Sequence, residues 1–467
     1  MRYFLLLTLL IFTFFGCKKN TDKPVKKKEI GLITKNAMVV SARIEASRIG
    51  NSILKQGGNA FDAMAATELA LAVAYPYAGN IGGGGFMIYR KNDGSIGALD
   101  YREKASKNAT KNMYLDSLDN VIPNISTRGA MAVGVPGTVA GVFASHKRFG
   151  SLPMSEILEP VIALAKKGVI VTKKQEARLI EKRKDFLEVN KDTILLAQNW
   201  KTNDTIKYNS LAATLARIKN NRRDEFYKGE TAKRLAKFIQ DNGGIITTED
   251  LAAYEAKWRE PVTLEYDGLK IISMSPPSSG GIALAQILKS IESFDLAEYG
   301  HNSVKAIQVI TEAERRAYAD RSYYLGDPDF VTVPQDKLIS DAYLKGRMSN
   351  FSFDKATPST EVSHGSVQII ESDETTHYSI VDQFGNSISV TTTLNSGYGS
   401  KLYASELGFF LNNEMDDFSS KPGVPNVYGL IGAEANSIVP EKRMLSSMTP
   451  TIVEKNGELY MLSLIHI

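Results

Sequence analysis

The most informative segment for the fold begins Thr375-Thr376-His377-Tyr378-Ser379 and continues to Leu394. Residues 376–381 and 387–394 are rich in β-branched and aromatic side chains, which favour extended strands. The segment between them, Asp382-Gln383-Phe384-Gly385-Asn386, carries residues that form turns. The simplest interpretation is a β-hairpin that turns within residues 382–386.

Further strand pairs and several helices are predicted around this hairpin. Residues 86–89 and 96–101 flank the turn signal Asn92-Asp93-Gly94, and residues 262–274 alternate as a strand pair does. Helices are predicted at 44–54, at 60–74, through most of 138–258, at 282–293 and at 303–322. Helical blocks on both sides of antiparallel strands predict an α+β protein built as a layered sandwich.

The composition is that of a globular protein. Of 467 residues, 43% are hydrophobic and 23% are charged, which excludes a mostly disordered chain, a collagen-like repeat and a polytopic membrane protein. The 56 Lys and Arg nearly balance the 52 Asp and Glu, so a dedicated nucleic-acid surface is not expected. The single cysteine rules out an internal disulfide, and the 5 histidines do not stand at metal-ligand spacing.

The first residues have the pattern of a secretory signal peptide, predicted to span residues 1–16. Arg2 is followed by a run of about a dozen apolar side chains, shorter than the roughly 20 residues of a transmembrane helix. Cys17 follows the small Gly16, which resembles the bacterial lipoprotein signal, in which this cysteine is lipidated. Phe14 departs from that pattern and leaves ordinary signal-peptide cleavage open.

The lysine-rich segment 17–30 is interpreted as a solvated tether. Together with the signal, it predicts a protein of the periplasm or cell envelope that is attached to a membrane by lipid and does not span it.

The start of the hairpin also offers a candidate nucleophile, Thr375. A threonine hydroxyl reacts poorly unless a base takes its proton, and neither a Gly-x-Ser-x-Gly elbow nor a Ser-His-Asp pattern is present. A chain cut before Thr375 would free an α-amine with a pKa of about 8, which can serve as that base. On composition alone, the β propensity of threonine explains Thr375-Thr376 more simply.

Five motifs, which occur in one order along the chain, favour the reactive interpretation. They are Gly79-Asn80-Ile81-Gly82-Gly83-Gly84-Gly85-Phe86-Met87, Asp100-Tyr101-Arg102-Glu103, Thr375-Thr376-His377-Tyr378-Ser379, Leu411-Asn412-Asn413-Glu414-Met415-Asp416-Asp417-Phe418 and Leu445-Ser446-Ser447-Met448-Thr449-Pro450-Thr451. With these motifs the chain resembles the bacterial γ-glutamyltransferases (γ-glutamyltranspeptidases), which are N-terminal nucleophile hydrolases. The resemblance extends over nearly all of residues 31–458.

The resemblance implies a precursor that cleaves itself between Glu374 and Thr375. The products would be a large subunit, residues 31–374 after the leader and tether, and a small subunit, residues 375–467, which pair with each other in a four-layer αββα sandwich. Thr375 would attack the γ-amide of glutathione or another γ-glutamyl compound and form a threonyl ester. Water would complete a hydrolysis, and an amino acid or dipeptide acceptor would complete a transpeptidation. No cofactor is implied.

The resemblance also assigns roles to the other motif residues. The glutamyl end of the substrate is a zwitterion, so Arg102 is expected to hold its α-carboxylate with a bidentate fork, assisted by Ser446 and Ser447. The expected acceptors for the α-ammonium are Asp417, Glu414 and Asn395, and Thr393 is expected to hydrogen-bond the nucleophile. Taken singly, Arg102 could be a surface ion pair, Ser446-Ser447 a helix cap and Asp416-Asp417 a solvated turn.

Three other features have predicted roles. The segment Pro422-Gly423-Val424-Pro425-Asn426-Val427-Tyr428-Gly429 resembles a mobile lid in which Tyr428 shields the donor pocket, although it could also be an ordinary loop. Gly82 to Gly85 lack the spacing of a nucleotide-binding loop and are expected to permit close backbone approach. His377 is expected to be a packed strand residue.

In the family, the strand that corresponds to Leu459 to Leu462 is soon followed by a Pro-Gly-Gly turn, whose backbone amides form the oxyanion hole. Here the sequence after Leu462 reads Ser463-Leu464-Ile465-His466-Ile467 instead. The small subunit is therefore expected to be incomplete at its C-terminus. Two other functions stay open: a related self-processing acylase that acts on a different amide, and a non-catalytic surface lipoprotein that binds amino acids.

Overall fold

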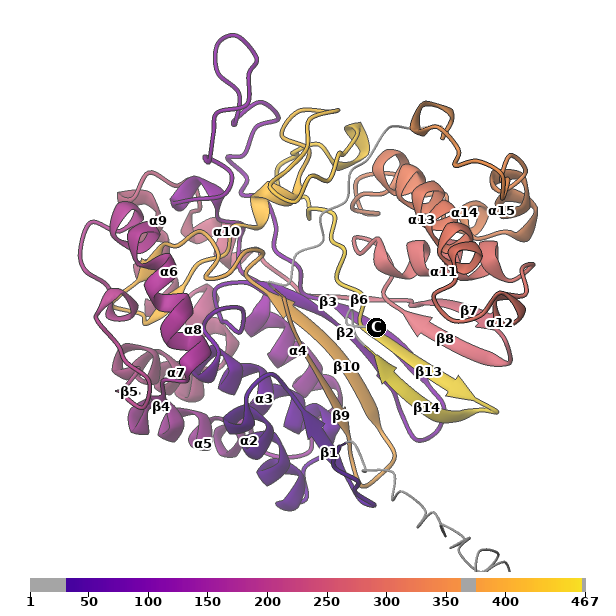
Figure 1. The fold of residues 1–467 in the computed structure, drawn as a ribbon. Coiled ribbons are helices and arrows are strands. Elements are labelled where there is room, and N and C mark those ends of the chain that lie inside the picture. Colours follow the sequence, from indigo (N-terminus) through magenta and orange to yellow (C-terminus); the bar gives the residue numbers. More distant parts are fainter. Residues whose placement is uncertain (1–30, 363–374, 464–467) are drawn as a thin grey trace, which may run out of the picture. The chain divides into compact units, whose positions relative to one another are not determined.

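The computed structural model describes residues 31–362 and 375–463 (Figure 1). The chain divides into two units, Met1–Lys35 and Asn36–Ile467, and the described part of the first, residues 31–35, contains no helix or strand. The predicted signal peptide, Cys17, the tether and Glu374 lie outside the described residues. The second unit carries the candidate site.

A six-stranded antiparallel sheet forms the centre of the second unit. Its strand order is β1 (Met38–Val40), β9 (Thr376–Val381), β10 (Ser387–Thr393), β2 (Gly84–Arg90), β3 (Ile96–Asp100) and β6 (Lys257–Arg259). Both predicted hairpins are therefore present, as β9–β10 and β2–β3. The strands that follow residue 375 lie in the middle of the sheet, between β1 and β2 (Figure 1).

Asp382 determines how the β9–β10 hairpin turns. Its Oδ1 accepts hydrogen bonds from the backbone N–H groups of Phe384 and Asn386, both at 2.9 Å, as an aspartate that stabilises a turn does. Its Oδ2 accepts from the backbone N–H of Ala60 at 2.8 Å. Gly385 has a φ of 87°, which a residue with a Cβ rarely adopts. The same carboxylate thus forms the turn and ties it to the first residue of a helix.

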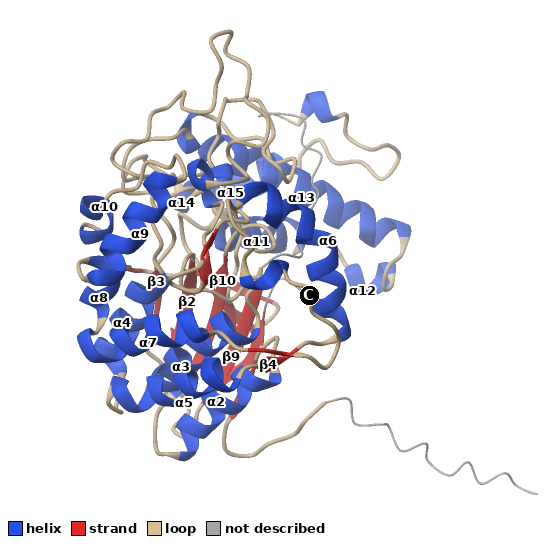
Figure 2. Ribbon diagram, turned by 90° about the vertical axis from the view of Figure 1, so that its left-hand side faces the viewer, coloured by secondary structure: helices blue, strands red, loops and turns tan. Residues whose placement is uncertain are grey.

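That helix, α3 (Ala60–Ala74), is buried along its whole length. It begins with a capping box in which the Asn59 side chain and the Asp62 carboxylate each bond the other's backbone N–H. Figure 2 shows the helices that cover the face of the six-stranded sheet against which α3 packs. They are α2 (Ile44–Lys55), α3, α4 (Thr138–Phe149), α5 (Met154–Lys167) and α7 (Asn209–Asn221).

Further helices continue this side of the unit: α6 (Lys173–Val189), α8 (Arg223–Tyr227), α9 (Glu230–Asp241) and α10 (Thr248–Ala252). Met87, Tyr89, Tyr378 and Val390 belong to the core that the sheet shares with the helices. Strand neighbours alternate between the two faces, so Phe86 and Ile88 belong to a different core.

A second antiparallel sheet packs on Phe86 and Ile88. Its order is β14 (Glu458–Ser463), β13 (Thr451–Lys455), β8 (Leu269–Ser273) and β7 (Val262–Tyr266). Ile272 and Ile452 from this sheet join Phe86 and Ile88 in one buried cluster. The predicted strand pair within 262–274 is confirmed as β7 and β8.

Helices pack on the second sheet as well. They are α11 (Gly280–Ile291), α12 (Leu296–Tyr299), α13 (Val304–Tyr324), α14 (Gln335–Leu338) and α15 (Asp341–Arg347). Ile282 and Ala285 of α11 share a core with Val262, Leu264 and Ile271 of the sheet. The short pairs β4 (Val169–Ile170) with β5 (Thr205–Ile206), and β11 (Tyr403–Ala404) with β12 (Phe409–Phe410), complete the described strands.

The expectation of a mixed helix and strand protein with antiparallel sheets is confirmed. None of the helices described within residues 31–362 and 375–463 is long and apolar enough to cross a bilayer.

Candidate active site

Four central strands begin or end at one edge of the six-stranded sheet. Thr376 at the start of β9 pairs with Thr392, Thr393 at the end of β10 pairs with Gly84, and Phe86 pairs with Asp100 at the end of β3. The antiparallel register therefore places Thr375, one residue before the first pair, beside Thr393. Arg102 follows β3 by two residues at the same edge.

Thr375 is half-buried, and Thr393 is buried. The Thr393 Oγ1 accepts a hydrogen bond from the backbone N–H of Asn395 at 2.8 Å, and its carbonyl accepts from the Asn80 side chain at 2.8 Å. The Thr393 hydroxyl oxygen thus accepts one hydrogen bond, and its proton is still available for donation to another group.

The glycines around the start of β2 lie against the backbone of β10. A Cβ on Gly83 would stand 2.2 Å from the Thr393 carbonyl oxygen, and one on Gly85 would stand 2.5 Å from the Thr391 carbonyl oxygen. Both separations are shorter than van der Waals contact, so a side chain would push the strand ends apart. The expectation that these glycines permit close backbone approach is confirmed.

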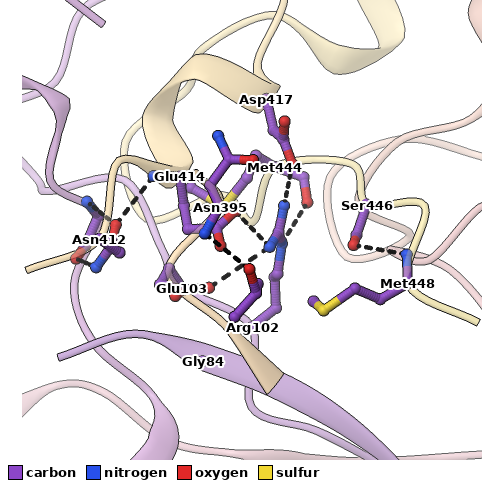
Figure 3. A network of polar contacts seen from close by, with 12 residues as sticks. Gly84, Arg102, Glu103, Asn395, Asn412, Glu414, Asp417, Met444, Ser446 and Met448 are labelled. Carbon is purple, nitrogen blue, oxygen red and sulfur yellow. Dashed lines mark hydrogen bonds and ion pairs between the residues drawn. The ribbon is translucent and has the colours of Figure 1, made fainter. Parts of the chain in front are cut away.

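Arg102 lies at the centre of a buried charge cluster (Figure 3). It is 1% exposed; its Nη1 lies 2.5 Å from Glu414 Oε2 and its Nη2 lies 2.5 Å from Asp417 Oδ2. Glu103 stands further off, with 3.7 Å between its Oε2 and Arg102 Nη1. Arg102 is therefore not a surface ion pair, and the residues expected to bind opposite ends of a zwitterion are here paired with each other.

Crowding of three carboxyl groups around one guanidinium shifts their proton affinities. Burial raises the pKa of Glu103 to about 8 although Arg102 acts against it, and burial raises the pKa of Glu414 well above its ordinary value. Neither carboxyl oxygen of Glu103 has a hydrogen-bond partner among the described residues. Because Glu414 and Asp417 lie closer to the guanidinium than Glu103 does, the geometry gives the short ion pairs of Arg102 to Glu414 and Asp417.

Asparagines hold the acidic segment against the sheet edge. The Asn412 side chain donates to the carbonyl oxygens of Gly82 and Gly134, both at 2.8 Å, and accepts from the Gly134 N–H at 2.9 Å. Asn395 adopts a φ of 74° and donates from Nδ2 to the Asn413 carbonyl at 3.0 Å. These bonds fix the distance of Glu414 from the strand ends.

Ser446 and Ser447 lie in an irregular segment that leads into β13. The Ser446 Oγ accepts from the Met448 N–H at 3.2 Å, and its carbonyl accepts from the Ser279 N–H at 2.7 Å. The Ser447 Oγ accepts from Arg321 Nη2 at 3.0 Å. The next described element is a strand, so the helix-cap interpretation of this serine pair is wrong.

The acidic pair anchors the segment that contains Tyr428. The Val427 N–H donates to Asp416 Oδ2 at 3.0 Å, and Asn426 Nδ2 lies 3.4 Å from Asp417 Oδ1. Tyr428 itself is half-buried, and its N–H donates to Asn426 Oδ1. Asp416 and Asp417 belong to a 3₁₀ turn and are hydrogen-bonded, so they do not form a solvated turn.

Sequence patterns left three residues of the site without a role. Glu103 and Asn412 stand inside quoted motifs, but only their contacts show what they do. Arg321 lies in the last turn of helix α13, where a basic residue is common, so the local pattern does not mark it as part of a site. His377 is a strand residue as expected, and its Nδ1 lies 3.0 Å from Thr391 Oγ1.

Within the described ranges, no three His, Cys, Asp or Glu side chains are grouped so that they could hold a metal ion. The carboxyl groups of the site surround an arginine instead.

Thr375 directly precedes β9, a central strand of the sheet, and this placement of a threonine is the one expected of an N-terminal nucleophile hydrolase. The gamma-glutamyltranspeptidase family model matches residues 46–463, so the chain belongs to this family.

Known proteins of this family are similar over most of the chain. A glutathione hydrolase proenzyme of Escherichia coli (strain K12) is 44% identical over 453 residues, which cover 96% of this chain and 77% of that protein. An acylase ACY 1 proenzyme of Pseudomonas sp. (strain V22) is 34% identical over 431 residues, which cover 90% and 75%.

A crystal structure of Helicobacter pylori gamma-glutamyltranspeptidase matches with a TM-score of 0.69 and 45% identity, covering 74% of this chain and 100% of that one. A cephalosporin acylase of Bacillus halodurans matches with a TM-score of 0.80 at 24% identity, which shows a common fold only.

Proposed function

We propose that this chain is a self-processing γ-glutamyltransferase and glutathione hydrolase. The observation that carries the proposal is the sheet edge at which Thr375, Thr393 and the Arg102 cluster meet. Family membership and relatives named glutathione hydrolase proenzymes support the same reaction. The donor would be glutathione or another γ-glutamyl compound, and the acceptor would be water, an amino acid or a dipeptide.

Thr375 becomes a competent nucleophile when the bond between Glu374 and Thr375 is cut. The freed α-amine takes the proton of the Thr375 hydroxyl as its Oγ1 attacks the γ-carbonyl carbon of the donor. The carbon–nitrogen bond of the amide breaks, the leaving amine takes the proton, and a threonyl ester forms. Water or an acceptor amine then attacks the ester and releases Thr375. A hydrogen bond from Thr393 would hold the hydroxyl in place.

Donor recognition follows from the charges around Arg102. The α-carboxylate and α-ammonium of a γ-glutamyl group sit on one carbon, so a selective pocket needs a cation and an anion side by side. The Arg102–Asp417 pair, at 2.5 Å, presents both. The donor carboxylate would turn to Arg102, Ser446 and Ser447, and its ammonium to Asp417, Glu414 and Asn395. Tyr428 would cover the bound glutamyl group.

The positions of the strands support the proposed division into subunits, residues 31–374 and 375–467, in a four-layer αββα sandwich. The small subunit would contribute β9 and β10 to one sheet and β13 and β14 to the other, in each case beside strands of the large subunit. Both buried cores contain residues from either side of the cut. The two pieces would therefore stay together after cleavage without a covalent link.

The test combines mass spectrometry with hydrolysis of γ-glutamyl-p-nitroanilide. The wild-type chain should separate before Thr375 and release p-nitroaniline. Thr375→Ser, which keeps a hydroxyl, should still be cut, whereas Thr375→Ala should remain one inactive chain. Hydrolysis by an uncut wild-type chain, or by Thr375→Ala, would rule out this mechanism.

A related acylase is the second candidate, and the similarity to an acylase proenzyme favours testing it. The Arg102–Asp417 pair suits an α-amino acid head group. A glutaryl anilide lacks the ammonium and should therefore be a poorer substrate than the γ-glutamyl anilide. The reverse preference would assign the chain to the acylases.

We also propose that Cys17 carries a lipid that attaches the protein to a membrane of the cell envelope. The support is the sequence alone, in which Cys17 follows an apolar run and Gly16. Mass spectrometry of the N-terminal peptide should find a diacylglyceryl thioether on Cys17, and Cys17→Ser should release the protein from the membrane fraction. An unmodified Cys17 on membrane-bound protein would refute lipid attachment at this residue.

A further inference from the structure

Arg321 is a buried arginine without a carboxylate partner. It lies in α13 and is 5% exposed, and within the described ranges no carboxylate oxygen lies within 4.0 Å of its guanidinium nitrogens. The buried Arg102, Arg316 and Arg443 each have one: Arg102 pairs with Glu414, Arg316 with Glu312, and Arg443 with Asp100. A buried charge is costly unless it is paired. Within the described residues, Arg321 therefore differs from these three arginines in having no short ion pair of its own.

Arg321 instead donates to two serine hydroxyls. Its Nε lies 3.0 Å from Ser279 Oγ, and its Nη2 lies 3.0 Å from Ser447 Oγ. A guanidinium has no acceptor atom, so both hydroxyl oxygens accept and must direct their protons elsewhere. The Ser279 hydroxyl donates to the Ser446 carbonyl at 2.8 Å. The Ser447 hydroxyl has no acceptor for its proton within the described residues, and Ser447 is half-buried.

The same segment connects Arg321 with the Arg102 cluster. Arg102 approaches the carbonyl oxygens of Met444 and Leu445 at 3.5 and 3.4 Å, and Arg321 binds Ser447 two residues further on. Residues 444–447 are thus held by Arg102 at one end and by Arg321 at the other. Burial lowers the pKa of Arg321, and the Tyr318 and Asp417 side chains partly oppose this effect. The negative charge of Asp417 therefore raises the pKa of both guanidinium groups, that of Arg102 and that of Arg321.

We propose that Arg321 is a positioning residue for the carboxylate end of the donor. By donating to Ser447 Oγ, it turns the Ser447 hydroxyl proton toward the site, where the α-carboxylate of a γ-glutamyl group accepts it. The carboxylate also supplies the negative charge that Arg321 lacks. The inference rests on the proposed function, because it assumes that Ser447 binds this carboxylate.

The test compares two donors that differ only in the α-carboxylate. γ-Glutamyl-p-nitroanilide carries it, and 4-aminobutyryl-p-nitroanilide keeps the amine and amide but lacks it. Arg321→Gln should raise the KM for the γ-glutamyl donor about 10- to 100-fold, the effect of a lost charge-assisted contact. Its kcat/KM for the 4-aminobutyryl donor should change less than about threefold. Arg315→Gln, six residues earlier on the same helix and partly exposed, is the control and should change neither.

A second variant shows whether Arg321 acts through Ser447. Ser447→Ala removes the hydroxyl, so adding Arg321→Gln to it should raise the KM for the γ-glutamyl donor less than Arg321→Gln does alone. Equal losses with both donors would mean that Arg321 only supports the fold, and an unchanged KM would also overturn the inference. A wild-type chain that does not hydrolyse the γ-glutamyl donor would instead refute the proposed function.

If Arg321→Gln is not processed, calorimetry replaces the kinetics. L-Glutamate and 4-aminobutyrate are then titrated into Thr375→Ala with and without Arg321→Gln. The inference requires that Arg321→Gln weaken the binding of L-glutamate more than that of 4-aminobutyrate. An equal effect on both ligands would overturn it.

Discussion

Glu68 provides a quantitative test of the buried environment beneath the site. It belongs to helix α3, is 0% exposed, and lies near the hydroxyl groups of Tyr378 on β9 and Thr392 on β10. Burial raises the pKa of Glu68 to about 7 from 4.5, although both hydroxyl groups act in the opposite direction. Between pH 4.5 and about 7, Glu68 is therefore mostly protonated in the folded protein and mostly ionised in the unfolded chain.

The sign of the effect follows from proton linkage. Between pH 4.5 and about 7 the folded state holds more protons than the unfolded state, so the free energy of unfolding falls as the pH rises. A shift of this size corresponds to about 3 kcal/mol once the pH is above both pKa values. Between pH 5 and pH 8 we expect about 2.5 kcal/mol of that change.

Glu68→Gln keeps the size of the side chain and cannot ionise, so it should lack this part of the pH dependence. Denaturant unfolding of wild type and Glu68→Gln at several pH values between 5 and 8 measures it. Relative to wild type, the variant should gain about 2.5 kcal/mol from the lowest to the highest pH, or roughly 3 °C in Tm. Other buried groups, Glu103 among them, are common to both proteins and cancel in the difference.

Glu45→Gln is the matched control, because the pKa of Glu45, on helix α2, is lowered. Burial is the largest single influence and raises this pKa, but hydrogen bonds and the charges of Arg43 and Arg48 together outweigh burial. Its difference from wild type should be flat over the same pH range. A flat difference for Glu68→Gln as well would refute the claim that Glu68 is buried in its neutral form.

Three further substitutions test the contacts that shape the site. Asn412→Ala removes the buried bonds to Gly82 and Gly134 and should lower the free energy of unfolding by about 2–4 kcal/mol in denaturant titrations. Gly83→Ala should displace Thr393 and slow both chain cleavage and γ-glutamyl hydrolysis. Gel electrophoresis measures the cleavage, and p-nitroaniline release measures the hydrolysis. Normal rates of both would show that the strand ends move apart at little cost. Asp382→Ala should lower the Tm, because the β9–β10 turn and the first N–H of α3 lose their acceptor.

Much of the local structure could be predicted from residue patterns. The turn residues of 382–386 predicted the β9–β10 hairpin, and the helix predicted at 60–74 agrees with α3. The ordered motifs predicted the family, which the family model confirms. Such features depend on neighbours in sequence, whose side chains determine turns, caps and strand alternation without help from distant residues.

Residue patterns were therefore enough to predict each hairpin, the main helices and the family, because these depend on residues close together in the chain. The three-dimensional packing was needed to show that β9 and β10 lie in the middle of the sheet. It was also needed to show that Arg102 pairs with Glu414 and Asp417, more than three hundred positions away. It also decided that Arg321 and Glu68 are buried, although both stand in ordinary helices. Burial and the pairing of charges depend on which surfaces pack together, and packing brings together segments that are far apart in the sequence and carry no local signal of their contact.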